Sequence, residues 1–332
     1  MSLKELRQPA GIAERPRPVT GALSPVPRVS VVICAYTMER LHDICEAVDS
    51  VLAQTEKPDE IVVSIDHNEE LLQKLKTELP SEVKFVLNQG TIGSAETRNT
   101  AIRFSDGDIV AFIDDDAIAE KNWLRNLKEH YRDPSVMAVG GRLNSVWRDG
   151  RPGWFPEELD WVVGGTYKGH PEGRTHVRNL IAANMSFRSK VCDHIGFILT
   201  DLGALGKTAR AGDETEFCMR IGHHIPDAII LYEPNAIVYH KASPREATLK
   251  HLITRSFNEG RYKGKSTRIY SALSQNPLST ESAYLRYLLS TAIPRRLRSF
   301  YKKGSIVHLG AIILSIAVVG AGYLVGKVSQ TP

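Results

Sequence analysis

Short apolar runs alternate with segments of helical period over the first third of the chain. The runs are rich in β-branched residues, which predicts strands at residues 29–34, 60–66, 83–88 and 108–116. The segments between them predict helices at residues 39–54, 69–79 and 95–104. Strands that alternate with helices in this way predict a parallel, doubly wound α/β sheet. Ligands of such sheets bind outside the carboxyl ends of the strands, so the polar residues that follow each strand are the candidates for chemistry.

The pattern loosens after the fourth strand. Residues 136–147 predict a further strand, residues 179–191 a strand that leads into a helix, and residues 228–241 late strands that end at His240. Residues 148–173 are rich in Gly, Pro and aromatic residues, which is typical of an irregular region that faces a substrate. Trp154 and Trp161 in this region are candidates for stacking on a substrate, and packing inside the protein is the alternative.

The two ends of the chain differ in hydropathy. Residues 1–28 are polar and contain prolines, which predicts a flexible arm and no secretory signal. Residues 305–325 carry no formal charge, and ~20 apolar residues are what an α-helix needs to cross a bilayer. A buried core helix is the alternative. Basic residues crowd the N-terminal side of this segment, so the positive-inside rule places the preceding domain in the cytoplasm.

Composition narrows the class of protein. Apolar residues make up 42% of the 332 residues, which excludes a largely disordered chain. The four cysteines are far apart and form no CxxC pair, which argues against a zinc site or a disulfide framework and fits a reducing compartment. The net charge is only +4, but no Asp or Glu follows Ser282, so the C-terminal region favours an anionic neighbour. Residues 255–264 are basic with interleaved aromatics, and we interpret them as facing a phosphate-bearing lipid and not a nucleic acid.

Three consecutive aspartates, Asp114, Asp115 and Asp116, end the fourth apolar run. No GxGxxG follows the first strand and no GxxxxGK[ST] occurs, which argues against a dinucleotide-binding domain and a P-loop. Clustered carboxylates at a strand end suit Mg²⁺ or Mn²⁺, which take oxygen ligands and bridge to phosphates. The alternative is a solvated loop or the favourable N-terminus of a helix.

The order of the motifs resembles the inverting family 2 glycosyltransferases of GT-A fold. The resemblance covers residues 29–240 and rests on VSVVICAYTMER, EIVVSID, NQGTIGSAETRN, DIVAFIDDDAIAEKNWL and GDETEFCMR. The segments GGRLNSVW, WFPEELDW and AANMSFR are similar to enzymes that glycosylate polyprenyl phosphates or lipid-linked glycans, including the glucosyl-dolichyl phosphate glucuronosyltransferase group. The QxxRW signature of processive members is absent, which favours transfer of one sugar per encounter.

The resemblance implies roles for the residues at the strand ends. It implies that Asp66 recognises the nucleotide base, that Arg98 lies near the donor nucleotide, and that Asp114 contacts the ribose or sugar. It places Asp116 on the metal ion and leaves Asp115 uncertain. Without the resemblance, Asp66 could equally be a helix cap and Arg98 an exposed helix residue.

Further positions follow from the same comparison with the family. Ala35, Tyr36 and Glu39 follow the first strand and support the base site, and His240 is expected close to the metal or the diphosphate, although a lone histidine is often structural. The glycines Gly90 and Gly93 are turn residues or direct ligands.

The motif GDETEFCMR departs from the family's usual Gly-Glu-Asp-x-Asp-Leu. Alignment makes Glu214 the general base on the acceptor hydroxyl, with Asp213 as a rival and helix capping as the structural alternative. The whole sequence thus predicts a flexible arm, a GT-A domain at residues 29–245, a basic helical region at 246–304 and a membrane-spanning helix at 305–327. The predicted function is transfer of one sugar from a nucleotide-diphosphate donor, UDP-linked in the first instance, to a lipid-linked acceptor in the cell membrane. The alternatives are a polyprenyl-phosphate monosaccharide synthase and a non-catalytic, membrane-bound module that binds nucleotide-sugar.

Overall fold

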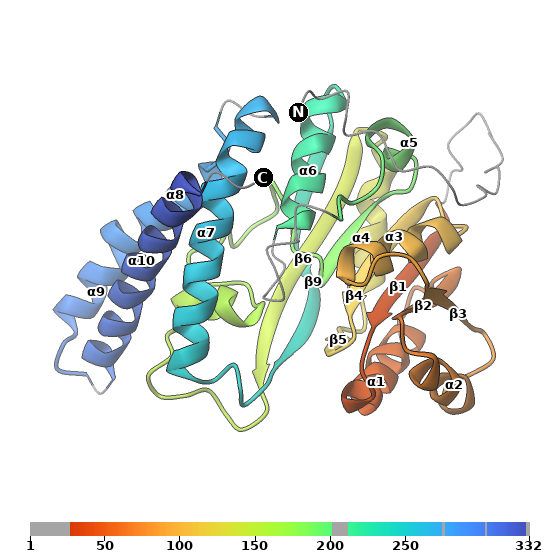
Figure 1. Ribbon diagram of the computed structural model, residues 1–332, viewed down its shortest axis with the longest axis horizontal. Coiled ribbons are helices and arrows are strands. Elements are labelled where there is room, and N and C mark those ends of the chain that lie inside the picture. Colours follow the sequence, from red (N-terminus) through yellow and green to blue (C-terminus); the bar gives the residue numbers. More distant parts are fainter. Residues whose placement is uncertain (1–26, 201–211, 274–275, 303, 330–332) are drawn as a thin grey trace.

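The computed structural model describes residues 27–200, 212–273, 276–302 and 304–329. The flexible arm predicted for residues 1–28 lies almost wholly outside these residues. One mixed β-sheet forms the centre of the described chain, with helices on both faces and a group of C-terminal helices at one side (Figure 1). The strands are β1 (Val29–Ala35), β2 (Glu60–Asp66), β3 (Val83–Asn88), β4 (Ile109–Asp114), β5 (Ala117–Ala119), β6 (Val136–Trp147), β7 (Thr175–His176), β8 (Asn184–Arg188) and β9 (Ile229–Ala242).

Strands β3, β2, β1 and β4 are parallel neighbours, which confirms the doubly wound arrangement predicted from the alternating pattern. Strand β8 then pairs antiparallel with β4, so the sheet becomes mixed beyond the fourth strand. The order continues through β6 and β9 to β5, and β7 pairs with β9. The parallel half of the sheet therefore ends at β4, whose next neighbour β8 runs in the opposite direction. The carboxyl end of β4 lies at this junction.

The helices account for most of the remaining described residues. Those that follow the parallel strands match the predicted segments closely, whereas the segment predicted as helix at residues 39–54 opens with a short 3₁₀ turn. The helices are α1 (Leu41–Leu52), α2 (Glu69–Glu78), α3 (Ser94–Phe104), α4 (Trp123–Lys128), α5 (Val191–Ile195), α6 (Asp213–His224), α7 (Leu249–Leu273), α8 (Ser279–Tyr287), α9 (Ile293–Arg298) and α10 (Ser305–Val328), with shorter turns at η1 (Met38–Arg40), η2 (Glu129–Arg132), η3 (Glu157–Val163) and η4 (Leu288–Ala292).

The parallel strands β1, β2 and β4 are buried on both faces. In β1, Val31 and Ile33 contribute to one apolar cluster and Val32 to another, because successive side chains of a strand point to opposite sides of the sheet. The first cluster includes Ile44 of α1, and the second includes Ile102 of α3. Burial on both faces explains why these strands appear in the sequence as continuous apolar runs without alternation.

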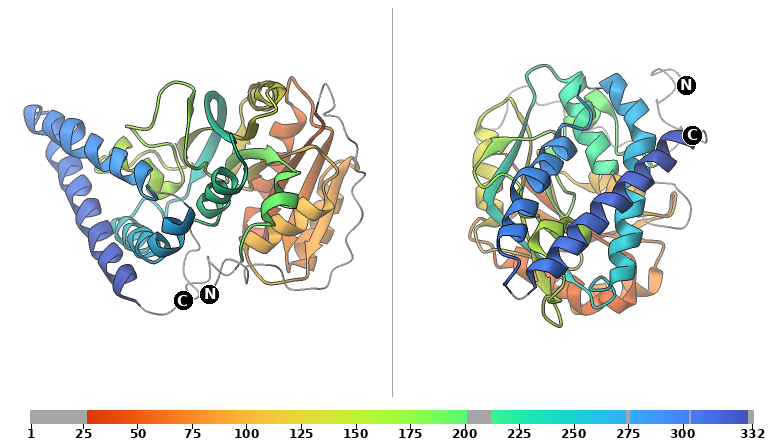
Figure 2. Two further views of the ribbon diagram at one scale, coloured as in Figure 1. Left: turned by 90° about the horizontal axis from the view of Figure 1, so that it is seen from above. Right: turned by 90° about the vertical axis from the view of Figure 1, so that its left-hand side faces the viewer.

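The C-terminal helices α7 to α10 lie together beside the sheet (Figure 2). A third apolar cluster joins them to the η3 segment, through Phe155, Val162, Leu252, Leu288 and Ile312 among others. This cluster lies apart from the two clusters that line the faces of the sheet. The C-terminal helices are therefore packed on the sheet domain by a core of their own.

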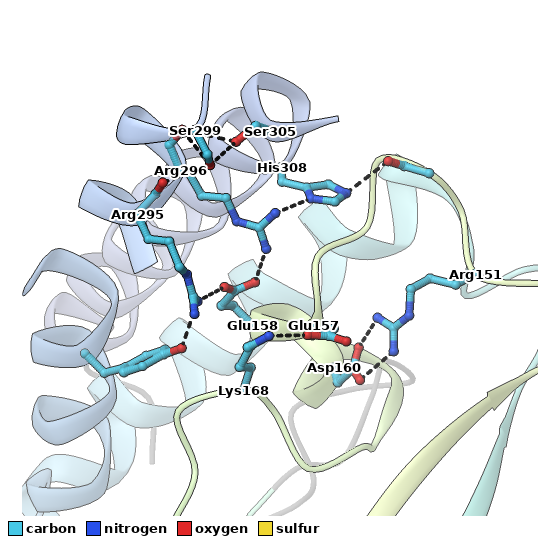
Figure 3. A network of polar contacts seen from close by, with 12 residues as sticks. Arg151, Glu157, Glu158, Asp160, Lys168, Arg295, Arg296, Ser299, Ser305 and His308 are labelled. Atoms are coloured by element: carbon cyan, nitrogen blue, oxygen red, sulfur yellow. Dashed lines mark hydrogen bonds and ion pairs between the residues drawn. The ribbon is translucent and has the colours of Figure 1, made fainter. Parts of the chain in front are cut away.

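A polar network reinforces this junction (Figure 3). The Glu158 carboxylate is fully buried, and it accepts hydrogen bonds from Arg295 at 2.9 Å and from Arg296 at 2.8 Å. Arg296 also donates to Nδ1 of His308 at 2.5 Å, and Nε2 of His308 donates to the backbone carbonyl of Gly153 at 3.0 Å. A buried carboxylate is tolerated when opposite charges pair with it, so Glu158 fixes α9 and α10 against η3.

Candidate active site

The three aspartates lie where the parallel half of the sheet ends. Asp114 is the last residue of β4 and pairs in register with Cys34 of β1. The chain turns at Asp115 and Asp116 and enters the short strand β5, which pairs antiparallel with β9 so that Ala117 is opposite His240. The backbone N–H of Lys241 donates to the carbonyl of Asp116 at 3.0 Å. Pairing of β5 with β9 thus brings the end of a distant strand to the aspartates.

Asp114, Asp116 and His240 form a compact group. Nε2 of His240 lies 3.3 Å from Oδ1 of Asp116 and 3.8 Å from Oδ2 of Asp114. One ligand atom from each residue fits within 4.8 Å of the other two. Burial alone would lower the pKa of His240, but the two carboxylates more than offset this effect and raise the pKa to about 10. The imidazole therefore carries a positive charge at neutral pH in the ligand-free protein.

Gly164 holds His240 from the other side. This glycine ends η3 with φ of +77°, a left-handed conformation that other residues rarely adopt. A Cβ atom at this position would lie 2.9 Å from Cε1 of His240. The backbone of η3 therefore packs directly on the imidazole, and only glycine leaves room for it.

Asp115 has a partner that the sequence did not indicate. Nη1 of Arg40, at the end of η1, lies 2.5 Å from Oδ1 of Asp115, and Nη2 lies 2.9 Å from Oδ2 of Asp116. Burial raises the pKa of Asp115 to about 7, against the opposing effect of the guanidinium. Arg40 thus bridges the second and third aspartates. Its position in the first turn after β1, at the same sheet edge, was the signal that could have revealed it.

The donor set fits a hard divalent cation. Oδ1 of Asp116 and Oδ2 of Asp115 are buried and have no hydrogen-bond partner of good geometry within the described ranges. Buried carboxylate oxygens without a donor are costly unless a cation completes their surroundings. Two carboxylates and one imidazole in this arrangement are suitable ligands for Mg²⁺ or Mn²⁺. Asp116, Asp114 and His240 are the residues that would hold the ion.

Asp66 organises the loop between β3 and α3. Its two carboxylate oxygens accept hydrogen bonds from the Asn88 side chain and from the backbone N–H of Gly93, each at 2.8 Å. Gly93 has φ of +134°, so glycine is required at this turn into α3. The role predicted for Asp66 in base recognition stays a prediction, and its position at the end of β2 is compatible with it. The structure gives Gly93 the turn role, and a direct role in ligand binding stays a prediction.

Arg98 of α3 connects the aspartates to the start of α6. Its guanidinium lies 3.0 Å from Oδ2 of Asp213 and 3.8 Å from Oδ1 of Asp114. The side chain is largely buried, so the alternative of an exposed helix residue is wrong. One cation thus stands between two acidic groups, and it brings the DDD segment and the GDETEF segment into a single site.

Asp213 and Glu214 lie in the first turn of α6, and their pKa values shift in opposite directions. Burial alone would raise the pKa of Asp213, but the nearby Arg98 charge holds it below its usual range. Burial raises the pKa of Glu214 to about 8, and the Asp213 charge adds to this increase. A carboxyl group whose pKa lies near neutrality is suited to accept a proton during catalysis. These surroundings favour Glu214 over Asp213 as the base.

The remaining predicted residues fall into two groups. Ala35 ends β1, and Tyr36 and Glu39 are exposed just beyond it, with the Tyr36 ring beneath the Arg40 guanidinium. In contrast, the partly buried Trp154 and Trp161 pack against the apolar cluster of the C-terminal helices. The structure thus gives these two tryptophans the packing role that was the alternative, and their substrate role stays a prediction without support from their position.

Comparison with known proteins identifies the class of enzyme. The sequence profile of glycosyl transferase family 2 matches residues 30–196. The chain belongs to this family. It is 34% identical over 305 residues to the glucosyl-dolichyl phosphate glucuronosyltransferase of Haloferax volcanii, which covers 90% of this chain and 96% of that protein. It is also 26% identical over 253 residues to the succinoglycan biosynthesis protein ExoM of Rhizobium meliloti, covering 71% of this chain and 74% of ExoM.

Two solved glycosyltransferases share the fold of this family 2 enzyme. The mannosyltransferase PcManGT of Pyrobaculum calidifontis, solved with GDP-Man and Mn²⁺, superposes with a TM-score of 0.57 at 18% identity and covers 94% of this chain and 91% of its own. GalNAc-T7, solved with UDP, GalNAc and Mn²⁺, gives 0.52 at 15% identity over 84% of this chain and 58% of its own. These similarities confirm the GT-A fold predicted from the order of the motifs, and the family assignment confirms that the protein is a glycosyltransferase.

Proposed function

We propose that this family 2 enzyme is a metal-dependent, inverting glycosyltransferase that works at the membrane. It transfers one sugar from a UDP-linked donor to a lipid-linked acceptor. The observation that carries the proposal is the convergence of Asp114, Asp116, His240 and Arg98 at the edge where the carboxyl ends of β1, β2 and β4 meet, with Asp213 paired to Arg98 and Glu214 beside it at the start of α6.

The reaction is a single displacement at the anomeric carbon of the sugar. The acceptor oxygen forms a bond to this carbon, and the bond to the nucleoside diphosphate breaks with its electron pair on the diphosphate. A bound Mg²⁺ or Mn²⁺ supplies Lewis-acid stabilisation of that leaving charge. Arg98, between Asp114 and Asp213, keeps the acidic groups ionised and in place.

Glu214 receives the proton of an acceptor hydroxyl in this proposal. A sugar hydroxyl has a pKa far above neutrality, so it needs a base as it attacks, in reach of ~3 Å. Asp213 is a weaker base because its ion pair with Arg98 stabilises its charged form. A polyprenyl phosphate oxygen is already anionic and would need no base, so the role of Glu214 separates the two acceptor classes.

The choice of acceptor is supported by the relative in Haloferax volcanii, whose name describes transfer of glucuronate to glucosyl-dolichyl phosphate. The exposed basic residues near the C-terminus are compatible with a surface that faces anionic lipid. The proposal keeps the sheet domain in the cytoplasm, as the charge distribution predicts, and the apolar helix α10 is the candidate for the tether.

A donor panel tests the proposed function. The full-length protein in membranes is supplied with UDP-sugars or GDP-sugars, lipid extract and Mn²⁺ or Mg²⁺, and the lipid product is identified by mass. We expect one added hexose or hexuronate on a lipid-linked glycan with release of UDP and no transfer after EDTA treatment. Release of GDP alone would overturn the UDP assignment, and nucleotide binding without any release would favour a non-catalytic module.

The raised pKa of Glu214 predicts a pH profile. The base must be deprotonated to act, and its pKa is about 8 in the ligand-free protein. At constant metal saturation, kcat/KM should therefore increase with pH by about tenfold per unit below this value and level off above it. The ascending limb should disappear in Glu214→Gln. A wild-type rate that is flat between pH 6 and 8 would contradict the assignment.

A further inference from the structure

We infer that α10 does not cross the bilayer, and that α8 to α10 instead attach the enzyme to one anionic membrane surface as an interfacial helical unit. This inference rests on the membrane association in the proposed function and specifies how it occurs. The length and composition of α10 alone permit a span, since its mean hydropathy is 2.2 over the most apolar window. Its packing argues otherwise.

Helix α10 lies along α7 over most of its length (Figure 1). The two helices run in the same direction, because their contacts advance together along both. The Ser256 and Ser315 hydroxyls are 3.1 Å apart. Further along, Gly260 lies against Val319, and Gly264 lies against the backbone near Lys327. A Cβ atom at Gly322 would lie only 2.2 Å from the carbonyl oxygen of Phe257. The two backbones therefore touch, and any movement of α10 into the membrane would take α7 with it.

Helix α7 is not a membrane helix. Along the same stretch it carries Arg255, Glu259 and Lys263, and Nζ of Lys263 lies 3.3 Å from Glu259 and 2.5 Å from Glu281 of α8. Glu281 is bound in turn by Arg178 of the sheet domain at 2.7 Å. Charged side chains at the centre of a bilayer are costly. A helix tied in this way to the sheet domain stays in water, and α10 stays beside it.

The opposite face of α10 is apolar and exposed. Only 28% of its most apolar window is buried, so a core helix of a soluble protein is also a poor description. Exposed apolar residues recur at helical spacing and form one stripe, which runs through Ile306, Gly310, Ile313, Ala317, Gly320, Leu324 and Val328. A helix with one face docked on protein and the other face apolar is suited to lie in the plane of a membrane interface.

Cations and aromatic side chains flank this stripe. The turn between α9 and α10 exposes Phe300 and Tyr301, and Arg298 and Lys302 are exposed beside them. Figure 2 shows α9 and α10 meeting at this turn, at the far end of the molecule from β3. No ion pair to an acidic side chain is recorded for either cation within the described part of the chain. This combination of apolar and cationic groups matches the headgroup region of an anionic bilayer.

The polar residues at the start of α10 are already used by the protein. His308 binds Arg296 and the backbone of Gly153, and Arg296 binds the buried Glu158 (Figure 3). Insertion of α10 across the bilayer would move His308 away from Arg296 and from the Gly153 carbonyl. The network thus holds the first turn of α10 at the level of the sheet domain.

A labelling experiment on the full chain in the membranes of a bacterial expression host tests the topology. Lys327→Cys at the end of α10, outside the apolar stripe, and Asp49→Cys on α1 as the reference in the sheet domain are treated with a membrane-impermeant maleimide in intact spheroplasts and in inverted vesicles, with the unsubstituted protein as background. We expect both positions to react in inverted vesicles and neither in spheroplasts. Reaction of Lys327→Cys in spheroplasts alone would show a spanning helix and overturn the inference. The experiment measures maleimide labelling and not sugar transfer. Its result therefore does not depend on whether the proposed function is correct.

Matched glycine variants test the docking. Gly322→Ala places a methyl group against the α7 backbone, whereas Gly320→Ala on the same helix meets open space. The thermal midpoint should fall by several degrees in Gly322→Ala and stay unchanged or rise in Gly320→Ala, because alanine favours a helix more than glycine does. Equal midpoints would contradict the docking. A loss of self-association in Gly322→Ala without any loss of monomer stability would also contradict it, because it would assign this face to a second copy.

Vesicle flotation tests whether the exposed stripe and its flanking cations bind an anionic membrane surface. The purified protein should bind vesicles that contain phosphatidylglycerol more tightly than vesicles of phosphatidylcholine alone. Salt, or the double variant Arg298→Gln and Lys302→Gln, should remove most of that difference. Equal binding to both vesicles would exclude an anionic surface as the partner.

Discussion

Replacing Asp116 with asparagine is expected to lower the rate of sugar transfer about a thousandfold. Asp116 places one carboxylate oxygen toward His240 and the other toward Arg40, and asparagine lacks the negative charge that Asp116 offers to the ion. A bound metal stabilises the leaving group by several kcal/mol, and each ~1.4 kcal/mol corresponds to a factor of ten. The rate is measured as release of nucleoside diphosphate at saturating donor with Mn²⁺.

Metal affinity provides a second measurement that does not depend on activity. Titration of Mn²⁺ into Asp116→Asn, followed by calorimetry or electron paramagnetic resonance, should show weakened binding, while circular dichroism should show the native fold. Asp49→Asn is the matched control, because Asp49 is an exposed residue on α1 away from the sheet edge. Unchanged Mn²⁺ affinity in Asp116→Asn would remove Asp116 from the metal site.

Asp115→Asn should have a smaller effect than Asp116→Asn. Its carboxyl pairs with Arg40, so the expected consequence is a displaced guanidinium and not a lost ligand. Asp115, the second aspartate of the DDD segment, thus has a role as the partner of Arg40, which in turn holds Oδ2 of Asp116.

Glu214→Gln is expected to lower kcat for a hydroxyl acceptor by about 10² to 10⁴, the usual range for loss of a general base. Glutamine has nearly the same shape but cannot accept the proton, so donor affinity should remain. Measurement of kcat and of the dissociation constant for UDP separates the two effects. A nearly normal rate would exclude Glu214 as the base and would favour a polyprenyl phosphate as the nucleophile.

Two further variants distinguish the carboxylates around Glu214. Asp213→Asn removes the partner of Arg98, so the pKa of Glu214 should fall and the ascending limb of the pH profile should move to lower pH. Glu216→Gln breaks a buried pair with Arg220 within α6, and we expect lower thermal stability with little change in the pH profile. Loss of the ascending limb in Asp213→Asn, with the limb retained in Glu214→Gln, would make Asp213 the base.

The parallel half of the fold could be predicted from the sequence because its physical cause is local. Strand β2, which is buried on both faces, appears as an almost uninterrupted apolar run, and both β2 and the edge strand β3 occupy the residues predicted for them. Asp66 and Asp114 were chosen as candidates because a strand end marks the edge where ligands bind.

The rest of the site depends on contacts between distant segments. The pairing of β5 with β9 brings His240 to Asp116, and no local pattern encodes which strands will pair. Arg40 was missed because its partners come from a segment far along the chain. The packing of Trp154 and Trp161 could not be predicted either, because the cluster that they pack against includes residues from α8 to α10, far along the chain.

The buried Glu158 restricts how a water-soluble version of this enzyme could be made. Removing the apolar C-terminal helices would leave its carboxylate without Arg295 and Arg296, and uncovering a buried charge in this way typically costs about 3–5 kcal/mol. The same η3 segment ends at Gly164 against His240, so the damage would reach the aspartates. A better design would keep all the helices and replace residues of the exposed stripe, such as Ile313 and Leu324, with polar side chains.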